Sequence, residues 1–296
     1  MTLRSSRIRR LAVIVLACAM VIGGHSESGA LDLSEIRSDV AGAGKTHEPS
    51  APKSKSHSKS KRRNSDDHDA CDDGLDDEIS SALGLASLAA LTSPFWGPKK
   101  ALHDSGGHPG FFARYPYREP GMPYLLDEFA EESYGWLFRG RLEYGDEFST
   151  MSHFGGQILL DTAIRLGIDS ELYVMEEDLG AAGTDRMYRG DANLVYRFAQ
   201  SSAIQMRTGI GLNWMDIGTD IDTGFNFTYS GDWFPADPWI MSAELDWGRI
   251  GEAGIFHGRL TTGIHYHRLE LFTGYDYVDI GDTQIGNVVA GIRLWQ

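Results

Sequence analysis

From Trp136 to the C-terminus, apolar and polar residues alternate along the chain. Trp136, Phe138 and Leu142 occupy one phase of this alternation, and Arg139 and Arg141 occupy the other. A period of two places successive side chains on opposite faces of an extended strand. The pattern therefore predicts β-strands that each have one apolar face and one polar face.

The alternating pattern recurs in about ten segments of about 8–13 residues, with no helical period between them. Strands of this length cross a hydrocarbon layer when they are tilted. We expect an all-β fold, an antiparallel up-and-down barrel of about ten strands, with eight as the alternative. The expected strands are 136–144, 154–165, 170–177, 190–199, 203–215, 223–231, 239–247, 255–265, 269–278 and 285–295.

The apolar face ends in aromatic residues at both predicted rims. Two aromatic bands around an aliphatic belt are typical of a barrel whose rims lie at lipid headgroups. The predicted rim that holds the strand termini carries Trp136, Phe198, Trp233, Trp239, Tyr266 and Trp295, and the opposite rim carries Tyr144, Phe154, Trp214, Trp247, Phe256 and Tyr277.

The other face of the predicted strands carries many charges. A soluble barrel would turn these charges to water, whereas a membrane barrel would turn them inward and pair them, because unpaired buried charges are costly. The export signal described below and the aromatic bands favour the membrane arrangement, with an interior ion-pair network that is structural. Its predicted members are Arg139, Arg141, Glu143, Asp161, Glu171, Arg197, Arg207, Glu244, Asp246, Arg259, Glu270, Asp276 and Arg293.

In this pattern the chain resembles the small outer-membrane barrels of Gram-negative bacteria, the class that includes the outer-membrane protein A transmembrane domain and porin-family barrels. The resemblance covers residues 135–296. It implies an outer-membrane location, with membrane lipid and the barrel assembly machinery as partners. One feature departs from the class. Such barrels usually end in an aromatic residue on the lipid face, but Trp295 is one position out of phase with the aliphatic residues Val288 to Leu294.

The N-terminal half is predicted to be a signal followed by a tether. Residues 1–30 combine four arginines with an apolar run too short to span a bilayer comfortably, which is typical of a signal peptide; an uncleaved anchor is the alternative. Residues 31–78 are charged and poor in aromatics, and we expect them to be disordered. Cys71 would be the one cysteine left after cleavage.

Residues 79–134 form the predicted lead-in to the barrel. Ile79–Leu91 is apolar and small, which favours one short helix against the barrel mouth or on a membrane surface. Residues 92–134 contain six prolines, and this spacing predicts neither a regular helix nor a central strand.

The chemistry of the chain favours a non-enzymatic outer-membrane barrel that is structural or weakly channel-forming. The formal net charge of −15 excludes nucleic acid as a partner. One alternative is an outer-membrane hydrolase acting on lipid or peptide, for which His153, His257 and His265 are candidate catalytic residues. No Ser/His/Asp spacing in the sequence requires a catalytic triad. A second alternative is a soluble secreted barrel that binds a hydrophobic ligand.

No cofactor, catalytic residue or metal ligand is assigned from the sequence. The two predicted outer loops at Asp216–Asp222 and Asp279–Asp282 share alternating carboxylates, which permits a weak calcium site. Turn formation explains aspartate and glycine at these positions equally well.

Overall fold

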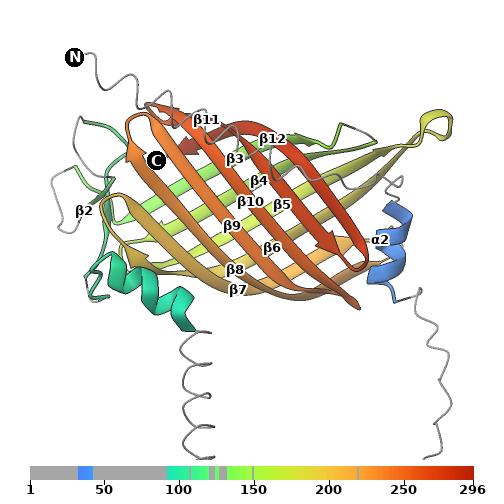
Figure 1. Cartoon of the computed structure of the whole chain (residues 1–296), viewed down its shortest axis with the longest axis horizontal. Coiled ribbons are helices and arrows are strands. Elements are labelled where there is room, and N and C mark those ends of the chain that lie inside the picture. Colours follow the sequence, from blue (N-terminus) through green and yellow to red (C-terminus); the bar gives the residue numbers. More distant parts are fainter. Residues whose placement is uncertain are drawn as a thin grey trace, which may run out of the picture.

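The computed structural model describes residues 33–42, 92–106, 108–119, 124–126, 132–148, 150–218 and 220–296. Ten antiparallel strands close into one barrel in which each strand pairs with its neighbours in sequence and the last pairs with the first (Figure 1). The prediction of an all-β up-and-down barrel of ten strands is confirmed. The strands are β3 (Trp136–Asp146), β4 (Met151–Thr162), β5 (Leu166–Asp178), β6 (Thr184–Gln200), β7 (Ile204–Asp216), β8 (Ile221–Ala236), β9 (Trp239–Ile250), β10 (Ala253–Tyr266), β11 (Leu269–Ile280) and β12 (Thr283–Trp295).

The barrel has two distinct ends. β3 begins and β12 finishes at one of them, which we call the terminal end, and the other is the loop end. At the loop end, aspartate side chains fix the connections: the carboxylates of Asp146, Asp178 and Asp216 each accept the backbone N–H two residues later. This local bond closes a tight turn without strand pairing, so the loops stay short.

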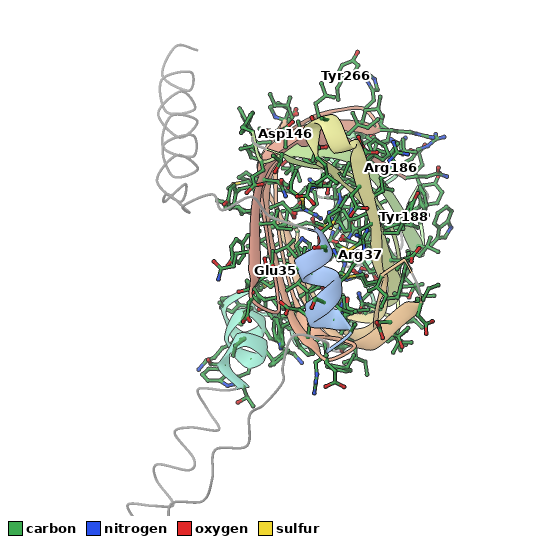
Figure 2. The ribbon with its side chains drawn as sticks, turned by 90° about the vertical axis from the view of Figure 1, so that its right-hand side faces the viewer. Glu35, Arg37, Asp146, Arg186, Tyr188 and Tyr266 are labelled. Atoms are coloured by element: carbon green, nitrogen blue, oxygen red, sulfur yellow. The ribbon has the colours of Figure 1, made fainter. Side chains whose placement is uncertain are left out.

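A short helix, α2 (Leu33–Val40), lies across the loop end (Figures 1 and 2). The disordered segment was expected to begin at residue 31, so this helix is a departure from the prediction. Its apolar residues Leu33, Ile36 and Val40 fall on one face and are buried, and burial of that face stabilises a helix too short to persist alone. The rest of the predicted tether and residues 1–30 lie outside the described residues.

The lead-in also contains more regular structure than predicted. Residues 92–101 are helical despite Pro94 and Pro98. Pro98 has no N–H to offer the Pro94 carbonyl, and the Tyr229 hydroxyl donates to that carbonyl instead, at 2.8 Å. Downstream, β1 (Phe111–Phe112) pairs with β2 (Leu125–Leu126) at the terminal end. Ile79–Leu91, the predicted short helix, lies outside the described residues.

Candidate functional site: the filled barrel interior and its two closures

The charged face of the strands points into the barrel. Every residue predicted for the interior network is buried, whereas apolar residues such as Leu212 on β7 are exposed, with 62% of that side chain accessible. Alternation explains the division, because consecutive residues of a strand point to opposite sides of the barrel wall. The arrangement is opposite to that of a soluble barrel with an apolar ligand cavity, so the interpretation as a soluble hydrophobic-ligand carrier is wrong.

Two arginines hold the middle of the interior. The Arg141 guanidinium contacts Glu171 at 2.5 Å, Glu244 at 3.2 Å and Glu143 at 3.3 Å. Arg259 contacts Glu143 at 2.9 Å and Glu244 at 3.4 Å. Because these carboxylates come from β3, β5 and β9, the shared ion pairs tie separate parts of the wall together across the lumen, and each buried charge has opposite charges beside it.

A tyrosine and a histidine extend this cluster. The Tyr173 hydroxyl accepts a hydrogen bond from Arg259 at 2.5 Å and donates one to Glu171. His257 places its two ring nitrogens 2.9 Å from Asp246 and 2.7 Å from Asp276. Both nitrogens are engaged by carboxylates, so His257 has no nitrogen left to activate a serine hydroxyl.

A second set of ion pairs lies nearer the terminal end. Arg207 bridges Asp161 at 2.9 Å and Asp232 at 2.7 Å. Asp161 also forms an ion pair with Arg197 at 2.5 Å, and Asp232 forms one with Arg139 at 2.7 Å. The chain of alternating charges leaves each guanidinium with a carboxylate partner, which a low-dielectric interior requires.

Several interior residues were not predicted from the sequence. Asp232 lies just beyond the predicted end of its strand, but it continues the phase of Thr228 and Ser230 and could have been found by extending the alternation. Tyr173 is two residues from Glu171 and therefore on the same face, although its aromatic ring suggested no polar role. Other buried polar residues that were not predicted are Gln157, Asp169, Arg189, Asp191 and Asn193.

Buried charged and polar side chains occupy the middle of the lumen. One interior cavity, between Arg139, Asp232, Glu244 and Arg293, has a volume of about 10 Å³. This is space for about one water molecule. The middle of the lumen is therefore a packed polar core.

The aromatic residues predicted for the two rims mostly lie on the outer wall. Trp136, Trp233 and Tyr266 are exposed near the terminal end, and Tyr144, Phe154, Trp247 and Phe256 near the loop end; Trp214, Trp239 and Tyr277 are half-buried. Phe198 is buried because Phe95 of the 92–101 helix covers it, with ring centroids 5.7 Å apart.

The prediction that Trp295 lies in the outer aromatic band is wrong. Trp295 is fully buried inside the terminal end, where its indole N–H donates to Glu270 at 2.8 Å. Its ring packs edge-on against Tyr124 at 5.6 Å between centroids. The out-of-phase position that the sequence showed is thus real: Trp295 belongs to the interior and not to the outer aromatic band. Glu270 also accepts Arg293 at 2.7 Å.

The terminal end is closed by the lead-in. Phe112 and Tyr134 exchange two backbone hydrogen bonds of 2.9 Å, and Phe112 is fully buried. Phe112, Ala113, Tyr124 and Leu125 pack with the interior-facing Leu137, Phe234, Ile240 and Trp295. His265 contacts the rings of Tyr115 and Tyr117 in the same region, at 6.2 and 6.1 Å between centroids.

A buried ion pair fastens the lead-in to the barrel. Arg165 has a positive φ in the turn after β4 and binds both carboxylate oxygens of Asp104, at 2.7 and 2.8 Å. Burial alone would raise the pKa of Asp104, but the hydrogen bonds from Arg165 and from the N–H groups of Gly106 and Gln200 hold the pKa of this carboxyl below its usual value. Asp104 therefore remains ionised near neutral pH.

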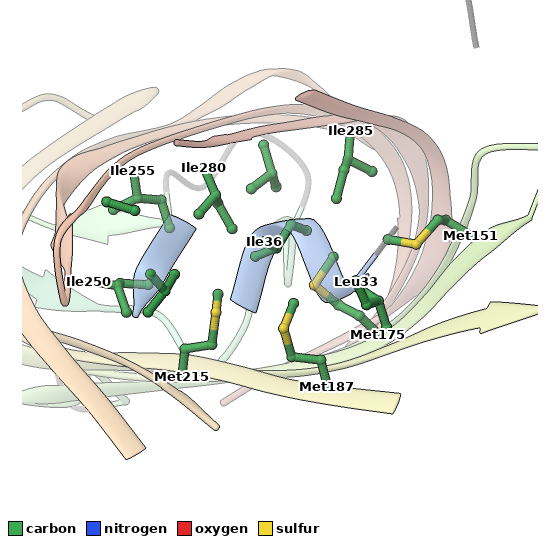
Figure 3. Close-up of a cluster of buried hydrophobic side chains, with 13 residues drawn as sticks. Leu33, Ile36, Met151, Met175, Met187, Met215, Ile250, Ile255, Ile280 and Ile285 are labelled. Atoms are coloured by element: carbon green, nitrogen blue, oxygen red, sulfur yellow. The ribbon is translucent and has the colours of Figure 1, made fainter. Parts of the chain in front are cut away.

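The loop end is closed by α2 in a collar of apolar side chains. Leu33, Ile36 and Val40 pack against four methionines, five larger aliphatic residues and one alanine that line the barrel mouth (Figure 3). This apolar collar consists of Met151, Met175, Met187, Met215, Ile250, Ala253, Ile255, Val278, Ile280 and Ile285.

Polar contacts hold α2 at both of its ends. The Leu33 N–H donates to Glu177 at 2.8 Å, and the Val40 carbonyl accepts the Glu252 N–H at 3.0 Å. Arg37 pairs with both carboxylate oxygens of Asp185 on the rim. In Figure 2, Arg37 lies at the barrel mouth close to Arg186. The helix is thus seated by apolar burial and positioned by the rim.

The predicted calcium and hydrolase chemistry gains no geometric support. Among the described residues, no group of three or more His, Cys, Asp or Glu side chains could hold a metal ion. Asp216 and Asp220 instead accept backbone N–H groups of their own loop, each at 2.8 Å. His153 is buried beside Glu143, at 3.8 Å, and the Tyr173 ring.

Among known proteins, the chain has distant structural similarity to other barrels. No protein-family model matches the chain, and no curated protein does. The chain is similar to a KdgM porin in complex with disordered oligogalacturonate, with 11% identity and a TM-score of 0.28 over 53% of this chain and 98% of the porin. A second KdgM porin structure has 7% identity and a TM-score of 0.24 over the same shares. Neither is outer-membrane protein A, so that finer resemblance stays a prediction.

Within the described parts of the chain, no helix has the length and apolar character needed to cross a membrane.

Proposed function

We propose that this protein is an exported, non-enzymatic β-barrel of the outer membrane, with a structural role and a lumen that is closed at rest. The observation that carries the proposal is the inverted wall: exposed apolar side chains surround a charged, ion-paired interior. Water would penalise such an exterior by roughly 25 cal/mol for each Å² of apolar surface, whereas hydrocarbon would accept it. Lipid is the solvent that this wall fits.

A structural role is favoured over weak channel activity by the filled interior. The ion pairs across the middle of the lumen and the closures at both ends obstruct the passage of a hydrated solute. The proposed partners are outer-membrane lipid and the barrel assembly machinery, reached through export by the N-terminal signal. The hydrolase alternative gains no support from His257, because its ring nitrogens both contact carboxylates.

Adjacent residues on β7 provide a matched test of the wall. Leu212 faces outward, and the next residue, Asn213, is buried inside with 4% of its surface accessible. Cysteines at these positions, in a Cys71→Ser background, would be probed in membrane fractions that resist carbonate extraction. We expect Leu212→Cys to react with a lipid-soluble thiol reagent and to be protected from a water-soluble one, while Asn213→Cys resists both.

Two results would contradict the proposal. Fast reaction of Leu212→Cys with the water-soluble reagent in intact membranes would place the wall in water, and release of the protein by carbonate would remove it from the membrane. Planar-bilayer recordings separate the structural role from the channel: regular conductance steps from the wild-type protein would favour a channel.

A further inference from the structure

The chain before the barrel reaches both of its ends. Helix α2 seats in the apolar collar at the loop end. The 92–101 helix lies outside the barrel and leads to Asp104 and Gly110, which bind the terminal end through Arg165 and the Ala163 carbonyl (Figure 1). Residues 43–91 therefore connect two points on opposite sides of the barrel. If the barrel spans a membrane, this connection crosses the membrane.

The lumen offers no route for that connection. Arg141 and Arg259 are ion-paired to carboxylates across its middle, and packed side chains close both of its ends. An extended polypeptide needs a passage several ångströms wide along the whole axis, since neighbouring strands alone lie about 5 Å apart. This leaves the outer wall as the surface available for the crossing.

The described residues already follow the outer wall for part of the way. Phe95 packs against Phe227 and Tyr229 on the outer face of β8, with ring centroids 6.4 and 6.1 Å apart. Phe227 pairs with Ile210, which is the middle residue of β7. Phe95 lies closer still to the ring of Phe198, at 5.7 Å between centroids, two residues before the end of β6. From Asp104 at the terminal end back to Phe95, the chain has thus risen along the terminal-end half of the wall.

The sequence before Phe95 is suited to the remaining distance. Residues 79–98 contain no charged side chain over 20 positions, and they follow an acidic stretch and precede Lys99 and Lys100. About 20 uncharged residues suffice to cross a hydrocarbon layer. Their alanine, serine and glycine content permits close packing on the exposed wall residues above Phe95, namely Leu194, Leu212 and Phe225.

We propose that the outer wall over β6–β8 is the docking surface for residues 79–91, which carry the chain across the membrane beside the barrel. Helix α2 and the acidic and basic stretches that follow it then lie on the loop side, opposite the C-terminus. This inference rests on the proposed membrane location. It gives the protein an N-terminal region that is displayed on one side of the membrane and closes the barrel from that side.

The native Cys71 tests the crossing in the full-length protein, because it lies between α2 and the uncharged stretch. A membrane-impermeant maleimide would be added to intact cells and, separately, to permeabilised cells. Two reporters in a Cys71→Ser background define the sides: Asp220→Cys in an exposed loop-end turn and Ser105→Cys, exposed at the terminal end. We expect Cys71 to label from the same side as Asp220→Cys, and to lose this labelling when the reagent reaches only the other side.

A charge within the uncharged stretch supplies a second measurement. Leu88→Arg disfavours the crossing and should move Cys71 labelling to the side of Ser105→Cys by about tenfold or more, whereas Leu75→Arg, in the acidic stretch, should leave it unchanged. Labelling of wild-type Cys71 together with Ser105→Cys overturns the crossing while the proposed location stands. Equal labelling of both reporters in intact cells overturns the membrane location and, with it, the crossing.

Discussion

At the loop end the barrel is closed by a separate helix among methionine and isoleucine side chains, whereas at the terminal end it is closed by aromatic rings, backbone pairing and a buried ion pair. The loop-end contacts join α2 to the wall through side chains and two backbone groups. At the terminal end, Phe112 and Trp295 share one cluster with residues of β3, β8 and β9. From this difference we expect the loop-end closure to separate from the barrel more readily than the terminal closure, which is part of the barrel's own core.

The largest expected effect is at the terminal end. Phe112→Ala removes a fully buried ring that stacks under the Arg197 guanidinium, 4.7 Å from the ring centroid. We expect the free energy of unfolding of the whole barrel to fall by about 3–5 kcal/mol. Urea unfolding in detergent micelles, followed by tryptophan fluorescence, measures it. A loss below about 1 kcal/mol would mean that the terminal closure is as separable as α2.

The corresponding change at the loop end should act locally. Ile36→Ala removes a fully buried side chain of α2, and we expect the docking of α2 to weaken by about 2–5 kcal/mol. The urea midpoint of the barrel should stay within error of wild type, while trypsin cleavage after Arg37 becomes faster. A fall in the barrel midpoint as large as that of Phe112→Ala would abolish the distinction between the two ends.

The strands and the two closures differ in how well the sequence predicted them. Alternation identified all ten strands, because an inverted wall requires one apolar and one polar side chain per pair of residues along each strand. The closures depend on tertiary contacts. Leu33, Ile36 and Val40 have helical spacing, but their stretch is short and charged, and only the collar makes the helix stable.

The aromatic residues show the same limit. Phase along the strand correctly separated Trp295 from the aliphatic residues of β12, but the predicted aromatic band placed it on the outer rim, and the structure places it inside. Phe198 follows the outward pattern, yet it is covered by Phe95, a contact between residues about a hundred positions apart. No local pattern encodes such a contact, because it depends on where the lead-in docks.

Acid should weaken the terminal closure through Asp104. The pKa of this carboxyl is held below its usual value by Arg165 and two backbone N–H groups, against the effect of burial. A depressed pKa in the folded state stabilises docking above the unfolded value, about 4, and this contribution is lost as the pH falls through the folded value. Hydrogen exchange of the Phe112 amide between pH 6 and pH 2.5, corrected for intrinsic rates, should show reduced protection at low pH.

Arg165→Gln provides the control for this pH effect. The variant leaves the Asp104 carboxylate without its guanidinium partner, so docking should weaken by about 1–3 kcal/mol at neutral pH and recover part of the difference as Asp104 becomes protonated. A pH dependence equal to that of wild type would show that the acid sensitivity of the terminal end comes from other carboxyl groups.

The smallest effect is expected at the rim beside α2. Arg37 and Asp185 retain 23% and 30% side-chain exposure, respectively, so water and salt screen their pairing, unlike that of Arg165 and Asp104, where both side chains are 4% exposed. Asp185→Asn should weaken α2 docking by about 0.2–1 kcal/mol, and 1 M salt should reduce the difference from wild type. The rate of trypsin cleavage after Arg37 measures both effects. Because the apolar collar remains intact in this variant, α2 should stay docked for most of the time; release comparable to that of Ile36→Ala would mean that the rim ion pair, and not apolar burial, holds the loop-end closure.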